Sequence, residues 1–243
     1  MPRPTPRPSG TEVPAPSGIE VLVFDVLGTM VDEPGGLRAA LREAVPAADG
    51  PFLDELLALW QDHVADAQRR VERGERPYAN SAAVDREAAR RVAAHAGVTD
   101  PVARERLATA SRRLPPWGDS VAGLVRLAER FAVVGLSHAD RATLLHLGAH
   151  TGLRWHQALS AEEAGAYKPA PEVYRLALDA AGCPPERALM VAAHAWDLRG
   201  ARAVGMRTAY VERPGGDPPT DSDAFTWRTS GLDELATVLT GPA

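Results

Sequence analysis

The chain has 243 residues, a formal net charge of −5 and 45% apolar residues. This acidic balance gives no support for binding to nucleic acid or to an anionic membrane, because both partners attract clustered positive charge. No apolar run approaches the length needed to span a bilayer. The one cysteine, Cys183, excludes a disulfide framework, so we expect a reducing, cytoplasmic location.

The N-terminal part of the chain predicts a tail, one strand and a helical insertion. Residues 1–18 are polar and rich in proline, which predicts a disordered tail and no signal peptide. The apolar run 20–24 predicts a buried strand that ends at Asp25. Residues 34–116 show helical patterns and no convincing strand, so we expect an all-helical cap over 34–116 that can cover a site and exclude water. Its helices are predicted at 53–72, 82–96 and 102–113.

Residues 19–33 and 117–243 predict the catalytic core. Apolar runs predict further strands at 131–136, 188–192 and 208–211. Helical patterns lie between or after them, at 141–150, 171–181 and 197–204. Alternation of strands and helices predicts an α/β fold with a doubly wound, parallel, Rossmann-like sheet. Ligands of such sheets bind beyond the carboxyl ends of the strands.

Polar residues follow three of these strands, and the only lysine follows the predicted helix 141–150. Asp25 ends the first strand, Ser137 and His138 follow the second, and His194 follows the third. All other basic side chains among the 27 Lys and Arg residues are arginines, so Lys168 marks a position where a compact ammonium is preferred to a planar guanidinium.

The segment Asp25-Val26-Leu27-Gly28-Thr29, with Ser137, Lys168 and Asp197, resembles the four motifs of the haloacid dehalogenase superfamily in their usual order. The strings Tyr167-Lys168-Pro169-Ala170-Pro171-Glu172-Val173-Tyr174 and Ala195-Trp196-Asp197 are similar to the L-2-haloacid dehalogenase (type II) branch. This resemblance implies hydrolytic dehalogenation of short 2-halo carboxylic acids through an aspartyl ester. It also implies a small-molecule substrate, and a homodimer is a further expectation.

The resemblance assigns a role to each motif residue. Asp25 is expected to be the nucleophile, Lys168 to keep it ionised, and Asp197 to assist the hydrolytic water. The expected substrate-binding residues are Thr29, Ser137, His138, Tyr174, His194 and Trp196. The alternatives are structural: Asp197, Thr29 and Ser137 could cap helices or turns, and the aromatic residues could be ordinary core.

Leu27 favours a dehalogenase over a phosphatase. Phosphatases of this superfamily carry an acid two residues after the nucleophile, which protonates the leaving group, and a leucine cannot transfer a proton. Ala193 lies where their magnesium-binding acid is expected, and an apolar side chain offers no oxygen ligand. We therefore expect a reaction without a metal ion or other cofactor.

The sequence departs from the dehalogenase pattern in the cap and in the fourth motif. The halide-binding Arg expected after a Trp is absent, because Trp60 is followed by Gln61. Arginines further along this helix are possible substitutes or a solvated face: Arg69, Arg70 and Arg73. Ala192, His194 and His138 replace the more usual Ser, Asn and Asn. His194 could position water, whereas the His146 and His150 pair has no third metal ligand in view.

Two rival functions stay open from the sequence. One is a magnesium-dependent phosphatase acting on a small phosphate ester. The other is a non-catalytic descendant that binds a small acid or a partner protein through the cap, which the missing Arg and the altered fourth motif would favour.

Overall fold

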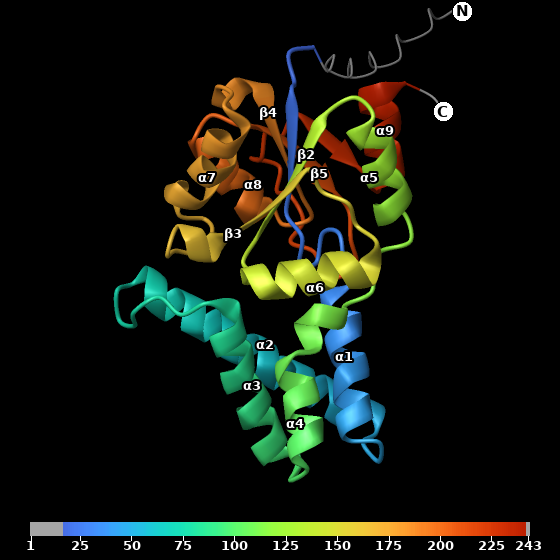
Figure 1. The fold of residues 1–243 in the computed structure, drawn as a ribbon, viewed down its shortest axis with the longest axis vertical. Coiled ribbons are helices and arrows are strands. Elements are labelled where there is room, and N and C mark those ends of the chain that lie inside the picture. Colours follow the sequence, from blue (N-terminus) through green and yellow to red (C-terminus); the bar gives the residue numbers. More distant parts are fainter. Residues whose placement is uncertain (1–16, 242–243) are drawn as a thin grey trace, which may run out of the picture.

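A six-stranded parallel sheet organises the protein, which is shown here as a computed structural model that describes residues 17–241 (Figure 1). The strands lie in the order β3-β2-β1-β4-β5-β6. Their bounds are β1 Val21–Phe24, β2 Ala132–Ser137, β3 Gln157–Ser160, β4 Ala188–Ala192, β5 Arg207–Val211 and β6 Trp227–Thr229. Apart from Ser17 and Gly18, the tail predicted over residues 1–18 lies outside the described residues.

Strand β1 is the central strand and carries Asp25 to the edge of the sheet. All four of its residues are buried, as expected for a strand covered on both faces. It pairs in parallel with β2 on one side and β4 on the other. The chain order of the strands reverses between these two neighbours, so the residues after β1 lie at the switch point where α/β sheets bind ligands.

Helices cover both faces of the sheet (Figure 1). On one face, α7 (Pro171–Ala181) and α8 (Ala195–Ala203) pack in a cluster that includes Met190 and Tyr174. On the other, apolar side chains of α5 (Ser120–Ala128), α6 (Arg141–Thr151) and α9 (Leu232–Thr240) share a cluster with Leu22 and Phe24. Two short 3-10 helices, η2 (Ala161–Glu163) and η3 (Pro185–Arg187), connect strands and helices on the first side.

The remaining helices form a module beyond the carboxyl ends of the strands (Figure 1). They are α1 (Glu33–Ala44), α2 (Gly50–Glu72), α3 (Ser81–His95), α4 (Pro101–Ala108) and the 3-10 helix η1 (Ala110–Arg113). Side chains of Asp49, Asn80 and Asp100 accept hydrogen bonds from the first turns of α2, α3 and α4, so each of these helices begins at a favourable cap. We call residues 34–116 the helical module.

The start of α3 ties the helical module to the sheet. The Ser81 hydroxyl donates to Asp140 Oδ2 over 3.1 Å and accepts from the Asp140 backbone N–H over 2.7 Å. The Tyr167 hydroxyl donates to the carbonyl oxygen of Ala79 over 2.5 Å. These contacts place the start of α3 and the loop before it against residues that follow β2 and β3.

The predicted α/β fold class is confirmed, and the predicted strands and helices lie within a few residues of those observed, except that the helix predicted over 102–113 is divided at Thr109 into α4 and η1. Strands β3 and β6 and helices α1, α5 and α9 were not predicted. β3 is an edge strand whose first two residues are exposed, so it lacks the long apolar run of a buried strand. α1 contains Pro34, Gly35 and Gly36, but all three lie in its first turn, where Asp32 accepts from the Gly35 N–H.

Gly200 allows α8 to pack against the residues that hold Lys168. A Cβ at this position would lie 2.8 Å from Pro169 Cβ and closer still to the Tyr174 hydroxyl. We predict that Gly200→Ala lowers the free energy of unfolding by about 1–3 kcal/mol, because overpacking strains a filled core. Gly148→Ala is the control, since its Cβ would meet only the Leu153 carbonyl oxygen, at 3.6 Å. Denaturant titration of both variants checks this, and equal stabilities would contradict it.

Candidate active site

Asp25 lies at the carboxyl end of β1 with both carboxylate oxygens held. Lys168 Nζ donates to Oδ1 over 2.9 Å, and the Thr29 hydroxyl donates to Oδ2 over 2.6 Å. Thr29 is oriented in turn by the Ala193 N–H, which donates to its hydroxyl oxygen over 3.0 Å. The carboxylate is therefore fixed in position by groups that follow β1 and β4 and by the only lysine.

Lys168 joins Asp25 to a second buried acid. Its Nζ also donates to Asp197 Oδ2 over 2.8 Å. The Tyr174 hydroxyl donates to the other oxygen, Asp197 Oδ1, over 2.7 Å. Asp25, Lys168 and Asp197 are only 7%, 2% and 0% exposed, so the cluster lies almost entirely out of water.

Burial and the single ammonium act in opposite directions on this cluster. Burial alone would raise the pKa of Asp25, but Lys168, together with His194 and Thr29, outweighs it and holds that pKa below its ordinary value. Burial raises the pKa of Asp197, and Lys168 offsets this only in part. Burial would lower the pKa of Lys168, and its two carboxylate partners raise it instead. Asp25 is thus ionised and Lys168 charged near neutral pH.

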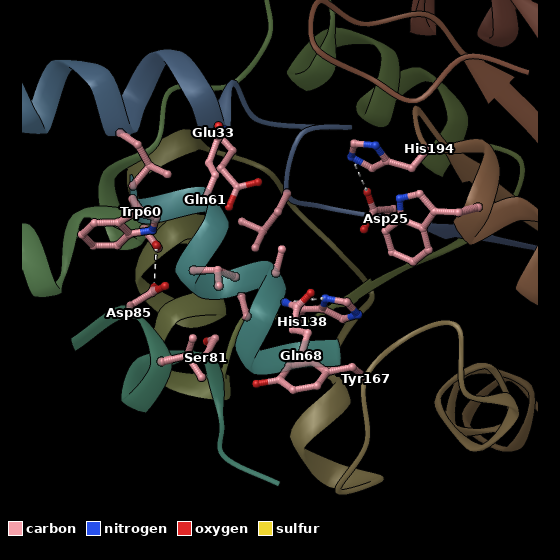
Figure 2. A pocket seen from close by; sticks show the side chains of 18 residues that line it. Asp25, Glu33, Trp60, Gln61, Gln68, Ser81, Asp85, His138, Tyr167 and His194 are labelled. Carbon is pink, nitrogen blue, oxygen red and sulfur yellow. Dashed lines mark hydrogen bonds and ion pairs between the residues drawn. The ribbon is translucent and has the colours of Figure 1, made fainter. Parts of the chain in front are cut away.

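A cavity of about 230 Å³ opens between Asp25 and the helical module (Figure 2). Its size suits a small ligand, being below the usual range for drug-sized ones. Residues after the strands form one side, and residues of α1, α2 and α3 form the other. The core residues that line it are Asp25, Leu27, His138, Ala139, Tyr167, His194 and Trp196. The helices contribute Glu33, Leu37, Trp60, Gln61, Val64, Ala65, Gln68, Ser81, Val84 and Asp85, and η1 contributes Ser111.

His194 faces the cavity beside Asp25 (Figure 2). Its Nε2 lies 4.0 Å from Asp25 Oδ2, and its ring stacks on Trp196 with a centroid distance of 5.8 Å. Gly28 makes room for it, since a Cβ at Gly28 would lie 2.7 Å from His194 Nε2. Gly28 also has φ +77°, a left-handed conformation that glycine adopts without strain. Oδ2 is therefore the oxygen of Asp25 nearest the cavity histidine.

His138 connects the lysine turn to the helical module. Its Nε2 accepts the Lys168 backbone N–H over 2.8 Å, and its Nδ1 lies 3.3 Å from the side-chain amide of Gln68 on α2. Burial lowers the pKa of His138 to about 3. The ring is consequently neutral, and because Nε2 accepts a hydrogen bond, its single proton belongs on Nδ1.

Two acids, from the first residue of α1 and from α3, line the cavity together with Asp25. Burial raises the pKa of Glu33 to about 8, with Asp85 and Asp25 adding to the shift. Burial likewise raises the pKa of Asp85 to about 6, although the Ser111 hydroxyl donates to Asp85 Oδ2 over 2.7 Å. The Glu33 carboxyl group is therefore neutral at pH 7, and the cavity is less negative than its composition indicates.

The structure separates the predicted site residues into two groups. His138, His194 and Trp196 line the cavity with Asp25. Thr29, Lys168, Tyr174 and Asp197 lie behind its wall and bond to Asp25 or to each other. Ser137 belongs to neither group, because its hydroxyl accepts the Ala139 N–H over 3.1 Å. A direct substrate contact by Thr29, Tyr174 or Ser137 is not supported by this placement.

The structure also bears on the alternative interpretations of Asp197, of the arginines at the end of α2 and of the His146 and His150 pair. Asp197 does not cap α8, because the cap residue is His194 and the Asp197 side chain bonds to Lys168 and Tyr174. Three arginines were considered as substitutes for the halide-binding Arg. They lie outside the cavity with exposed side chains: Arg69, Arg70 and Arg73. His146 and His150 are exposed on α6, as expected for a solvated face.

Glu33, Gln68, Asp85 and Ser111 were not identified from the sequence. Gln68 follows Gln61 by seven residues, a spacing that places both on one face of α2, and this was the only available signal for it. Within residues 17–241, no group of three or more His, Cys, Asp or Glu side chains is arranged to hold a metal ion. Within the same range, no helix has the length and apolar character to cross a membrane.

Comparison with known proteins agrees with this geometry. Residues 19–205 match the haloacid dehalogenase-like hydrolase family. The chain belongs to that family. It is 30% identical over 203 residues to the (S)-2-haloacid dehalogenase of Pseudomonas sp. strain YL, covering 81% of this chain and 84% of the relative.

A solved L-2-haloacid dehalogenase superposes with a TM-score of 0.81 at 30% identity, covering 90% of this chain and 97% of that one. A phosphoserine phosphatase of Thermus thermophilus is 34% identical, but only over 119 residues and 46% of each chain.

The tautomer of His138 can be tested directly. We predict that ¹⁵N NMR of histidine-labelled protein finds His138 neutral, protonated on Nδ1 and unprotonated on Nε2, from about pH 8 to about pH 5, because protonation of Nε2 would break its bond to the Lys168 N–H. His138→Ala removes the signal and assigns it. A His138 ring that titrates between these pH values, or that carries its proton on Nε2, would contradict the structure.

Proposed function

We propose that the protein hydrolyses the carbon–halogen bond of short 2-halo carboxylic acids through an ester on Asp25. The observation that carries the proposal is an ionised carboxylate at a strand end, held by Lys168 and Thr29, beside a small cavity in which Leu27 occupies the position of the phosphatase acid. A halide leaves as a stable anion and needs no such acid. The named relatives support the same substrate class.

In the first step, Asp25 attacks the halogen-bearing carbon. Oδ2 is the proposed nucleophilic atom, because it faces His194 on the cavity side while Oδ1 is bonded to Lys168. An oxygen–carbon bond forms as the carbon–halogen bond breaks, and the halide leaves with the bonding electrons. Holding the attacking atom in place lowers the entropic barrier of this displacement.

In the second step, water attacks the carbonyl carbon of the Asp25 ester. The Lys168 ammonium, 2.9 Å from Oδ1, stabilises the negative charge that develops on that oxygen. The ester bond then breaks, which releases the 2-hydroxy acid and one proton and restores the carboxylate. The net reaction consumes one 2-halo acid and one water and yields one 2-hydroxy acid, one halide and one proton.

His194 is the better placed of two groups that could orient the water. It lines the cavity beside Asp25, whereas both oxygens of Asp197 are bonded to Lys168 and Tyr174 and the side chain is fully buried. We therefore assign Asp197 to holding Lys168 in place, and His194 to the water. This replaces the direct contact between Asp197 and water expected from the sequence.

The helical module acts as a cap in this proposal. Its α2 and α3 supply the cavity wall opposite Asp25, which keeps bulk water from the ester. The boundaries 34–116, a homodimeric assembly and a cytoplasmic location remain predictions from the sequence.

A phosphatase is the second candidate, because a phosphoserine phosphatase is 34% identical over part of the chain. The residues do not fit it well: Leu27 and Ala193 provide neither a proton donor nor an oxygen ligand for magnesium. The two functions differ in their need for a metal ion, which makes them easy to separate.

The deciding experiment measures halide release from a panel of 2-chloro and 2-bromo acids, with and without a chelator. We expect release that survives chelation in the parent protein and falls by at least about 10³-fold in Asp25→Asn, which keeps the shape but removes the attacking oxyanion. Circular dichroism controls for folding. Absence of halide release, together with magnesium-dependent phosphate release from small esters, would contradict the proposal.

Glu33 predicts a specific pH dependence. Its carboxyl group is neutral below a pKa of about 8 and negative above it, so ionisation adds a charge that repels an anionic substrate. We predict that kcat/KM falls up to roughly tenfold from about pH 7 to about pH 9 and that Glu33→Gln removes this fall. A Glu33→Gln profile that overlays that of the parent protein would contradict the assignment.

A further inference from the structure

The cavity has to receive an anion without an Arg or Lys side chain among the described residues of its wall. Among its lining residues in the described part of the chain there is no Arg or Lys, and Lys168 lies behind Asp25. His138 is neutral, since its pKa is lowered to about 3. Binding of the substrate's carboxylate or of the departing halide, both required by the proposed function, therefore depends on His194 beside Asp25 and on neutral hydrogen-bond donors.

Helix α2 presents one row of side chains to this cavity. Trp60, Gln61, Val64, Ala65 and Gln68 line it, at the spacing of successive helical turns. Gln61 occupies the position where an Arg is expected from the family resemblance, and its side chain makes no hydrogen bond within the described residues. Gln68 lies two turns further along, next to His138 (Figure 2).

The hydrogen bonds of His138 determine how the Gln68 amide is oriented. Nε2 accepts the Lys168 N–H over 2.8 Å, so the neutral ring carries its proton on Nδ1. An Nδ1–H donor needs an acceptor, and the Gln68 amide atom at 3.3 Å is its partner. The structure places Nε2 at this position, but a nitrogen that donates cannot pair with an Nδ1–H donor, so we exchange the two amide atoms: the partner is the carbonyl oxygen Oε1, and the NH₂ group lies on the other side. Oxygen and nitrogen of a Gln amide are assigned from such networks.

We infer that the Gln68 NH₂ group is an anion-binding donor of this cavity, oriented by His138. With Oε1 bonded to Nδ1–H, the NH₂ group occupies the position of the other amide atom, which makes no hydrogen bond within the described residues, and Gln68 lines the cavity. The chain Lys168 N–H, His138, Gln68 thus links the turn that carries the lysine to the donor on α2. The two N–H bonds of this group can bind the carboxylate of a 2-halo acid or the halide that leaves it. The expected ligand is therefore a carboxylate or a halide.

Two substitutions separate this role from a merely structural one. Gln68→Glu keeps an oxygen that accepts the His138 Nδ1–H but replaces the NH₂ donor with an acceptor of negative charge. Gln68→Leu removes both functions without adding charge. An anion-binding role predicts that Glu is the more damaging change, whereas a role limited to holding His138 predicts that Leu is.

The experiment is a calorimetric titration of the full-length protein with bromide and, separately, with lactate as a short carboxylate that cannot react. We expect binding to weaken about tenfold in Gln68→Leu and about 100-fold or more in Gln68→Glu, for whichever anion Gln68 contacts. Arg69→Leu, next in the helix but exposed and outside the cavity, is the matched control and should bind like the parent.

Because the titration measures anion binding, its result does not depend on whether the protein turns over a substrate. Equal affinity of the parent and Gln68→Glu for both anions, a greater loss in Gln68→Leu than in Gln68→Glu, or no anion binding by the parent would overturn it. Loss of bromide binding alone identifies the halide end, and loss of lactate binding alone identifies the carboxylate end. Parent protein that binds these anions through Gln68 but releases no halide from 2-halo acids would refute the proposed function and leave the Gln68 assignment intact.

Discussion

The ammonium group of Lys168 holds two buried carboxylates, one at the end of β1 and the other in the first turn of α8. Its bonds to Asp25 and Asp197, of 2.9 and 2.8 Å, connect β1, the turn before α7 and the first turn of α8. Removing one partner from such a buried group typically costs about 3–5 kcal/mol, because the remaining charge is left uncompensated. A lysine suits this position because its compact charge fits between two single oxygens, where a planar guanidinium would not.

This arrangement leaves the described wall of the cavity without an Arg or Lys side chain. The positive group lies behind Asp25, while Glu33 and His138 on the wall are neutral at pH 7 because burial opposes their charged forms. Recognition of an anion in such a site depends on His194 and on oriented neutral donors, and the His138–Gln68 contact supplies that orientation for Gln68. In the proposed reaction, the helical module thus supplies a hydrogen-bond donor as well as a wall that excludes water.

The residues that could be predicted from the sequence are those that follow strands. Asp25, His138 and His194 were placed together because parallel strands end at the same edge, and Lys168 because it is the only lysine. Glu33, Gln68 and Asp85 were not found. They lie on helices, and the periodicity of a helix does not predict where that helix packs over the sheet. The sequence also gave no sign that Thr29 and Tyr174 turn inward to carboxylates.

The central claim, that Asp25 forms a covalent ester, is tested most directly by a single turnover in ¹⁸O-water with enzyme in excess over 2-chloropropionate. Hydrolysis of the ester at its carbonyl carbon places the heavy oxygen in the Asp25 carboxylate and transfers an original aspartate oxygen to the product. Mass spectrometry of the Asp25 peptide and of the 2-hydroxy acid should therefore find ¹⁸O in the peptide and none in the product. Heavy oxygen in the product, with none in Asp25, would mean direct attack by water and would contradict the account.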